Sequence, residues 1–362
     1  MLVYFTAFII TLFFCCLATK SKKKIQRGFF IILSIFPFFV VAAIRYNVGI
    51  DTWLNYRPTF ENVAQYGDRF DVLFYLNQKY EIGFSFIILI LSKVCKNSVI
   101  LFTFGSCIFT FFTFFAIYKQ SKMPCLSIMI LFLSGAFLLS MNGMRNYMAI
   151  AIVLFSIKYI YEKKLFKFIL CILVAASIHK SVVVLLVLYP LYLYKINIKQ
   201  VIISIILSII VMFFINDILS VLLSWTSYIN YFNTDKMVVD PLYTMLIINI
   251  FLLILFLFNY NNCKNDIKYN FYLKLQLFSV IICIFSLRLS LSYRLEQIID
   301  FFQIITIPYN VFLLKQNTSL KKSAVTGIAL LIIMVFSAYF AKVFILSDDN
   351  QLKNYTTIFS KE

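Results

Sequence analysis

Long apolar runs recur from the first residues of the sequence almost to the last. Hydrophobic residues make up 62% of the 362 residues, only 13% are charged, and the mean hydropathy is +0.91. A soluble domain of this length cannot bury so much apolar surface, whereas a lipid bilayer accepts it. The runs therefore predict an all-α, polytopic membrane protein with a single transmembrane domain over residues 1–362.

Twelve of these runs are predicted to cross the membrane, although several are short for a hydrocarbon core of about 30 Å. The first run precedes its lysines, which is the wrong order for a cleavable signal peptide, so it is read as a first span. A thirteenth segment, 81–94, is amphipathic and either spans or lies at the interface as a half-helix. The predicted spans are 2–18, 28–44, 98–117, 124–141, 146–161, 165–179, 181–194, 199–215, 241–258, 270–288, 297–314 and 323–345.

The lysines decide how segment 81–94 is placed. Of the 33 basic residues, seven are arginine and 26 are lysine. If 81–94 does not cross, sixteen lysines fall in loops on one side of the membrane, as the preference for cytoplasmic lysine requires. If it crosses, the lysine-rich loops fall on opposite sides. We therefore expect an interfacial half-helix, both termini outside and about twelve transmembrane helices.

The arginines are distributed in the opposite sense. Only Arg27 lies in a predicted cytoplasmic loop, and the other six lie at or beyond the outer ends of spans. A guanidinium group is permanently charged and binds phosphate or carboxylate through two parallel hydrogen bonds. The alternative is that some of these arginines only pair with Asp68, Asp71 or Glu81. The segregation favours an anionic ligand at the outer face.

Other classes of function find little support in the sequence. The formal net charge of +18 would suggest nucleic acid in a soluble protein, but here topology explains it. The eight cysteines form no CxxC pair and there is one histidine, so neither a metal site nor a cofactor is expected. No Walker A, GxGxxG, GxSxG, HExxH or DxD motif occurs. The substrate should therefore arrive already activated, in the membrane.

The largest predicted outer region comprises a loop and the interfacial helix over 45–97, and a second outer loop covers 216–240. Residues 45–80 contain nine aromatic residues and balanced charges. Aromatic rings stack on sugar rings, although they also anchor membrane interfaces for no functional reason. The charges among the rings favour a polar, extended ligand near Trp53 and Tyr56.

Further ionisable residues are predicted on the same outer side, where such residues mark functional sites by default. The alternative for His179 is an ordinary histidine that hydrogen bonds at the membrane interface. The alternative for Asp300 is a structural residue paired with Arg288 or Arg294. Glu296, Asp300 and Gln303 share one helix face at i, i+4 and i+7. The outer-side residues are Glu81, Arg145, His179, Lys180, Arg288 and Arg294.

Five motifs follow one another along the chain: "IRYNVGIDTWLNY", "YEIGFSFI", "MRNYMAIAIVLFSIKYI", "SIHKS" and "YRL". In this order they resemble the EpsG/Wzy family of bacterial polysaccharide polymerases. The resemblance covers roughly residues 1–315. The segment "EQIIDFF" after "YRL" departs from the pattern, which leaves the roles of Glu296 and Asp300 open.

The resemblance implies a GT-C-like fold and a metal-independent glycosyltransferase. It would join undecaprenyl-pyrophosphate-linked oligosaccharide repeats at the outer face of the bacterial cytoplasmic membrane, with a chain-length regulator as a further partner. The resemblance carries Arg45, Asp51 and Tyr56 over from the first motif, and Glu81, Arg145, His179 and Arg294 from the others.

From the chemistry, Arg145 and Arg294 are expected to bind pyrophosphate, with Arg45 as the third candidate. The base that accepts the proton of the attacking hydroxyl is left among Glu81, Asp51 and His179. Two alternative functions remain, a flippase or transporter for the same lipid-linked sugars, and an O-antigen ligase. A flippase needs basic residues along its whole path, whereas these gather at the outer rim.

Overall fold

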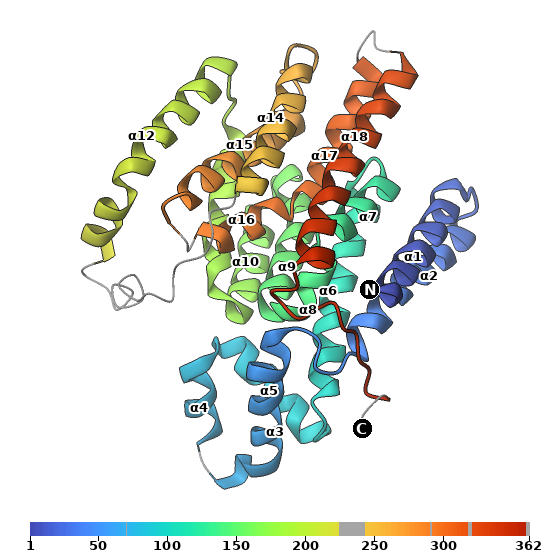
Figure 1. Cartoon of the computed structure of the whole chain (residues 1–362), viewed down its shortest axis with the longest axis vertical. Helices are drawn as coiled ribbons and strands as arrows, with labels where there is room; N and C mark the ends of the chain where they lie inside the picture. Colours follow the sequence, from blue (N-terminus) through green and yellow to red (C-terminus); the bar gives the residue numbers. More distant parts are fainter. Residues whose placement is uncertain (70, 224–242, 290–291, 318–320, 360–362) are drawn as a thin grey trace. The chain divides into compact units, whose positions relative to one another are not determined.

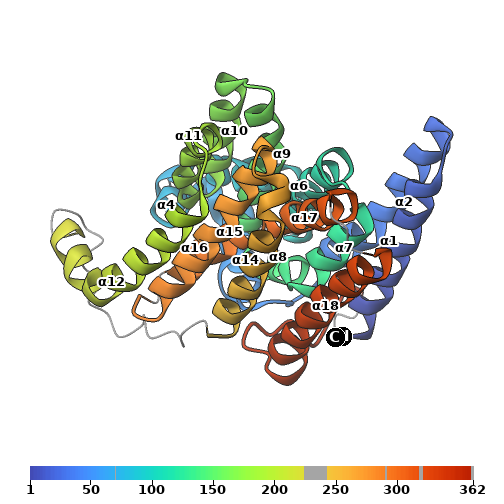
Figure 2. The ribbon, with the colours of Figure 1, turned by 90° about the horizontal axis from the view of Figure 1, so that it is seen from above.

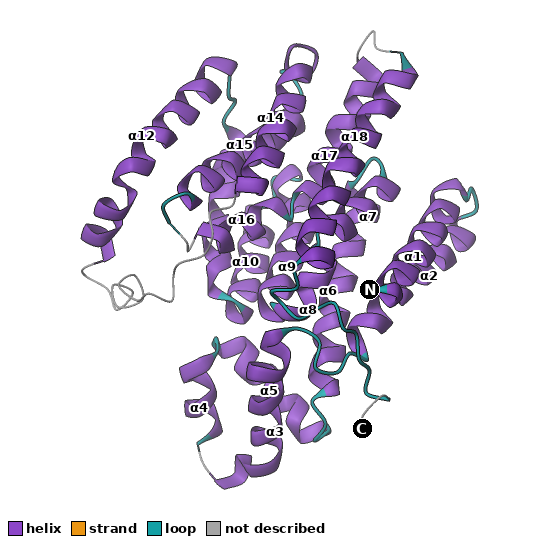
Figure 3. Cartoon of the chain, in the orientation of Figure 1, coloured by secondary structure: helices purple, strands orange, loops and turns teal. Residues whose placement is uncertain are grey.

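In a computed structural model, the protein is built of helices (Figures 1 and 3). The structure describes residues 1–69, 71–223, 243–289, 292–317 and 321–359, and no strand occurs among them apart from one isolated bridge between Arg45 and Thr357. The chain divides into two compact units. The first comprises 1–187 and 329–362, and the second 188–328.

The first unit contains the predicted outer region 45–97 and most of the predicted motif residues. Its helices are α1 (Leu2–Lys20), α2 (Lys24–Ala43), η1 (Thr52–Tyr56), α3 (Arg57–Tyr66), η2 (Gly67–Arg69), α4 (Val72–Lys79), α5 (Ile82–Val94), α6 (Val99–Gln120), α7 (Pro124–Leu133), α8 (Ala136–Asn142), α9 (Met144–Tyr161), α10 (Leu165–Ile178), η3 (Lys180–Val187), α18 (Lys322–Phe340) from Ala329 onward and η5 (Ala341–Leu346). Helix α9 is its central element, because almost all of its side chains from Tyr147 to Leu154 are buried.

The second unit contains the remaining helices. They are α11 (Leu188–Leu193), α12 (Ile198–Leu223), α14 (Tyr243–Cys263), α15 (Ile267–Ser286), α16 (Ser292–Asp300), α17 (Gln303–Asn317) and the first turns of α18. Helix α15 is capped by the side chain of Asp266, which accepts hydrogen bonds from the backbone N–H groups of Lys268 and Tyr269. This helix is the core of the second unit, since most of its side chains are buried.

Seven helices among the described residues are long and apolar enough to cross a membrane. They are α1, α2, α6, α12, α14, α15 and α18 with η5, and they match seven of the twelve predicted spans. Two bent pairs raise the number to nine if each pair is one span. The multi-pass membrane class is therefore confirmed, whereas twelve spanning helices are not confirmed by the part of the chain that the structure describes. The remaining predicted spans, 146–161, 165–179 and 181–194, correspond to the buried α9, the short α10 and the junction of η3 with α11.

One of the two bent pairs has a visible local cause. Helices α7 and α8 meet at 51°, and Gly135 between them has φ +78°, a left-handed conformation that ends a helix. Helices α16 and α17 meet at 41° around Phe301 and Phe302. The predicted spans 124–141 and 297–314 are thus each broken in two.

The predicted outer loop is largely helical. Its helices α3 and α4 both pack on α5, and Figure 1 shows the three at one end of the first unit. Helix α5 has 13 residues, or about 20 Å, which is too short to cross a hydrocarbon core. This length agrees with the prediction that segment 81–94 does not cross.

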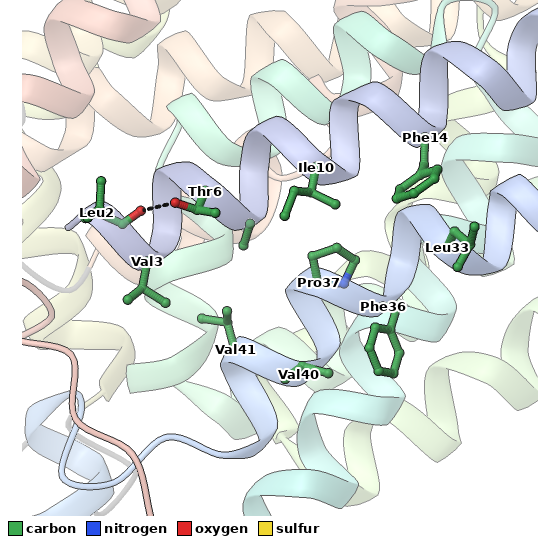
Figure 4. Close-up of a pocket in the computed structure, with 11 residues that line it drawn as sticks. Leu2, Val3, Thr6, Ile10, Phe14, Leu33, Phe36, Pro37, Val40 and Val41 are labelled. Carbon is green, nitrogen blue, oxygen red and sulfur yellow. Dashed lines mark hydrogen bonds between the residues drawn. The ribbon is translucent and has the colours of Figure 1, made fainter. Parts of the chain in front are cut away.

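Helices α1 and α2 lie side by side, as both views of the ribbon show (Figures 1 and 2). An apolar groove of about 480 Å³ runs between them, lined by residues such as Ile10, Phe14, Phe36 and Val40 (Figure 4). Both helices are candidate spans, so a groove of this composition suits the hydrocarbon of a bilayer.

The segment after η5 folds back over the first motif. The backbone N–H groups of Tyr46 and Gly49 donate to the carbonyl oxygens of Thr356 and Gln351, at 2.9 and 3.1 Å. The Tyr355 hydroxyl donates to the Val41 carbonyl oxygen at 2.8 Å. The tail, to which the sequence assigned no role, thus helps to shape the outer region.

Candidate functional site

Three ionisable residues from separate motifs meet at helix ends in the first unit. Glu81 is the residue before α5, Arg145 lies in the first turn of α9, and His179 follows the last residue of α10. Backbone groups at helix termini lack partners within the helix, so polar side chains and ligands gather there. The sequence analysis selected all three residues, and the structure brings them together.

The Glu81 carboxylate lies at the centre of this cluster. Its Oε2 accepts a hydrogen bond from Arg145 NH1 at 2.6 Å, which is a short, charge-assisted contact. Its Oε1 accepts from the backbone N–H of Lys180 at 3.2 Å and lies 3.5 Å from His179 Nδ1. The three side chains retain between 15% and 20% of their accessible surface, so the cluster is largely enclosed but still reachable.

A glycine allows Glu81 to approach His179. A Cβ atom at Gly83 would come within 2.7 Å of the Ser177 carbonyl oxygen and would also meet the Ser177 hydroxyl group. Only glycine leaves room for α5 to pack so closely on α10. The close contact of the two helices holds the start of α5, and therefore Glu81, against the end of α10.

Aromatic rings form one wall of the cluster. The Arg145 guanidinium carbon lies 4.6 Å from the ring centroid of Tyr80 and 5.6 Å from that of Phe84, in cation–π range. The Tyr56 ring lies 6.3 Å from Tyr80 and 5.9 Å from Phe84. Tyr56 is 4% exposed and hydrogen bonds to Arg145, so it positions the guanidinium group from below the surface.

The surroundings of Glu81 keep its carboxylate ionised. Partial burial raises its pKa, but the His179 imidazole, the Lys180 N–H and the Arg145 charge outweigh burial and lower the pKa to about 2. A general base works best when its pKa is near the operating pH. Glu81 is therefore suited to orienting and charge-balancing its neighbours rather than to accepting a proton.

Four buried polar atoms of the motifs around Arg145 and His179 have no hydrogen-bond partner. They are Arg145 Nε, Asn146 Oδ1, His179 Nδ1 and Ser181 Oγ. Buried polar groups are nearly always paired in folded proteins, and those that are not point to strain or to a ligand. The sequence analysis overlooked Asn146 and Ser181, although each stands next to a selected residue.

Asp51 and Trp53 lie in the same unit but interact with other residues. The backbone N–H of Asp51 donates to Asn142 Oδ1 at 2.9 Å, and its carboxylate accepts from Asn55 Nδ2 at 2.8 Å. Trp53 is 39% exposed, and its Nε1 donates to Gln351 Oε1 at 3.1 Å. Trp53 thus links the predicted outer loop to the C-terminal tail, whereas Asp51 links it to the end of α8.

Arg45 is 1% exposed and lies inside the first unit. Its guanidinium group donates to the Ala42 carbonyl oxygen, to Ser106 Oγ at 3.2 Å and to Met144 Sδ at 3.6 Å, and it lies over the Phe102 ring. The backbone next to Arg45 is covered by the C-terminal tail. In this structure its side chain is bonded to the protein interior and does not line an open site.

The other arginines differ in their surroundings. Arg57 pairs with Glu61 at 2.9 Å, an acid outside the set of Asp68, Asp71 and Glu81 considered as alternative partners. Arg145 does pair with one of that set, Glu81. Arg288 and Arg294 are exposed and belong to the second unit, where the Arg288 guanidinium lies 5.4 Å from the Phe213 ring centroid. The side chain of Arg69 and most of the predicted outer loop 216–240 lie outside the described residues.

Glu296, Asp300 and Gln303 belong to a buried network in the second unit. Asn249 Nδ2 donates to Asp300 Oδ2 at 2.9 Å, and Asn249 Oδ1 accepts from Gln303 Nε2 at 2.6 Å and from Gln276 Nε2 at 2.9 Å. No ion pair links Asp300 to an arginine among the described residues. The sequence analysis missed Asn249 and Gln276, although an amide in the middle of an apolar helix is itself a signal.

The described residues contain no group of three histidine, cysteine, aspartate or glutamate side chains that could hold a metal ion. That no metal or cofactor takes part remains a prediction. The site as it stands offers a cation, an imidazole, a fixed carboxylate and an aromatic wall. These groups can bind an oxyanion and take up a proton beside it.

Residues 28–357 match the EpsG family, and this range includes all the motifs described above. The chain belongs to the EpsG family. EpsG proteins are Wzy-like polysaccharide polymerases, so a role of this general type and a multi-pass location in a membrane follow. No curated protein and no solved structure matches the chain.

Proposed function

We propose that this EpsG protein is a polymerising glycosyltransferase that acts at the outer face of the bacterial cytoplasmic membrane. Its substrates are oligosaccharide repeats linked to undecaprenyl pyrophosphate. The observation that carries the proposal is the meeting of Arg145, Glu81 and His179, with unpaired polar atoms around them, in a member of a polymerase family. The segregation of arginine from lysine along the sequence supports the outer face.

Arg145 is assigned to the pyrophosphate group of the donor. One of its amino groups is engaged by Glu81, whereas its Nε is unpaired. When the bond between the sugar C1 atom and the pyrophosphate oxygen breaks, negative charge grows on that oxygen. A fixed guanidinium group stabilises this charge in the transition state more than in the ground state, which is what lowers the barrier. Arg294 and Arg288, in the second unit, remain proposed additional contacts.

His179 is assigned to the acceptor. The hydroxyl oxygen of the acceptor sugar attacks C1, and its proton must leave as the new glycosidic bond forms. We assign that proton to the imidazole Nε2, and the Glu81 carboxylate, 3.5 Å from Nδ1, is placed to balance the charge that the ring gains. This is the arrangement in which a carboxylate orients a histidine rather than acting as the base itself. Glu81, held at a pKa of about 2, suits the orienting role.

Complementation of a deletion strain tests the function. A polymerase defect leaves single repeats on the final acceptor, a ligase defect leaves none, and a flippase defect strands precursor inside the cell. We expect the deletion strain to carry single repeats, and the wild-type chain to restore the polymer. Absence of any repeat on the acceptor, or trapped internal precursor, would replace the proposal with the ligase or the flippase respectively.

A further inference from the structure

Two carboxyl groups lie inside the second unit, close to the bend between α16 and α17. Glu296 and Asp300 are one helical turn apart on α16, at positions i and i+4 on one face of the helix. Glu296 is 4% exposed. A buried carboxylate is costly unless a cation or hydrogen-bond donors surround it. The Glu296 and Asp300 pair therefore needs a cation or hydrogen-bond donors close by.

Protein donors satisfy only part of the pair. Asn249 Nδ2 donates to Asp300 Oδ2 at 2.9 Å. Glu296 Oε1 and Asp300 Oδ1 are both buried and have no donor. Two ionised carboxylates cannot hydrogen bond to each other, because neither has a hydrogen to give. One proton between them supplies the missing donor.

The groups bonded to Asp300 directly or through Asn249 are uncharged. Helix α14 contributes Asn249, which bonds to Asp300, and Asn249 in turn bonds to Gln276 and Cys283 of α15 and to Gln303 of α17. Among the described residues no lysine or arginine pairs with either carboxyl group. The amide of Asn249 already receives hydrogen bonds from Gln276 and Gln303, so few oxygens remain for a metal ion, which requires about six.

We propose that Glu296 and Asp300 form a binding site for one exchangeable proton, which they share within the second unit. The network of Asn249, Gln276 and Gln303 fixes the geometry of the pair and leaves the two free carboxyl oxygens to the proton. The bend of 41° between α16 and α17 interrupts the helix next to the site. Broken helices with buried polar groups are where membrane proteins commonly hold ions and protons.

Infrared spectroscopy of the full chain in lipid nanodiscs tests this proposal. The C=O stretch of a protonated carboxyl group is separate from the carboxylate bands and shifts in deuterated water. We expect such a band at neutral pH, shifted in deuterated water and lost at alkaline pH. It should be absent from the double variant Glu296→Gln/Asp300→Asn and unchanged in Glu162→Gln, whose carboxylate is exposed and pairs with Lys164.

The outcomes separate the alternatives. A wild-type protein without the band at neutral pH overturns the proposal, as does a band that persists in the double variant. A band that appears only when sodium is replaced by choline assigns the site to a metal cation instead. If the double variant does not fold, the pH titration of the wild-type band and its shift in deuterated water still test the proposal. None of these readouts depends on polymer synthesis, so an inactive polymerase does not affect them.

Discussion

Arg45 and Arg145 carry the same guanidinium group but lie in different surroundings. Arg45 is bonded to the Ala42 carbonyl oxygen, Ser106 and Met144, and burial lowers its pKa to about 10, which leaves it charged at neutral pH. Arg145 faces a partly open cluster. The Nε atom is buried without a hydrogen-bond partner in both side chains. Both were predicted to bind pyrophosphate, and for both this stays a prediction.

Arg45→Ala should therefore destabilise the protein rather than selectively stop polymerisation. Loss of hydrogen bonds from a buried charged group typically costs about 1.5–3 kcal/mol. We expect a lower thermal unfolding midpoint and a lower yield of folded protein. Residual polymerase activity should scale with the amount that folds. An Arg45→Ala protein with normal stability and no activity would indicate that Arg45 binds the substrate.

Glu81 should make stability depend on pH in acid. Its pKa is about 2 in the folded protein against an ordinary 4.5, so between these values the unfolded chain binds a proton that the folded protein does not. Glu81 thus stabilises the fold above about pH 4.5, and this contribution, at most about 3 kcal/mol, disappears as the pH falls toward 2. We expect the difference in thermal unfolding midpoint between the wild type and Glu81→Gln to shrink as the pH is lowered from neutral to about 3. A constant difference would contradict the account.

At the scale of elements, the contact between α5 and α10 builds the cluster. Gly83→Ala would place a methyl group within 2.7 Å of the Ser177 carbonyl oxygen, so the start of α5 must move and take Glu81 away from His179. We expect polymer synthesis to fall at least tenfold while the protein still inserts. Gly28→Ala is the matched control, because a Cβ atom there meets nothing within 4 Å. Equal activity of the two variants would show that this contact does not position the site.

At the scale of the whole chain, the sequence predicted the membrane class, the seven long spans and the residues of the cluster. Those spans are continuous apolar runs, so composition and length suffice to find them. The bends at Gly135 and near Phe301 were missed, because an apolar run does not reveal where a helix breaks. The return of the tail to Tyr46 was also missed, because contacts between distant residues leave no local pattern. Whether a selected arginine faces a site or the core likewise depends on tertiary packing.

Reporter fusions test the topology that places the cluster outside. Fusions after residues 22 and 164 should report the cytoplasm, because lysine-rich loops remain there, and a fusion after residue 65 should report the outside. The length of α5 supports this arrangement. Reports from opposite faces for 22 and 164 would mean that the number of crossings between them is odd, and the outer-face assignment would fail.

The most direct test of the central claim is the length of the glycan ladder made by purified protein from a lipid-linked repeat. Arg145→Lys keeps the charge but loses the planar fork, and His179→Ala removes the proposed base. We expect Arg145→Lys to slow polymerisation roughly 100- to 1,000-fold, the usual effect of losing a transition-state contact. His179→Ala should also shorten the ladder, whereas Arg57→Lys, which keeps a partner for Glu61, should make full-length ladders. Full activity of a folded Arg145→Lys protein would contradict the account.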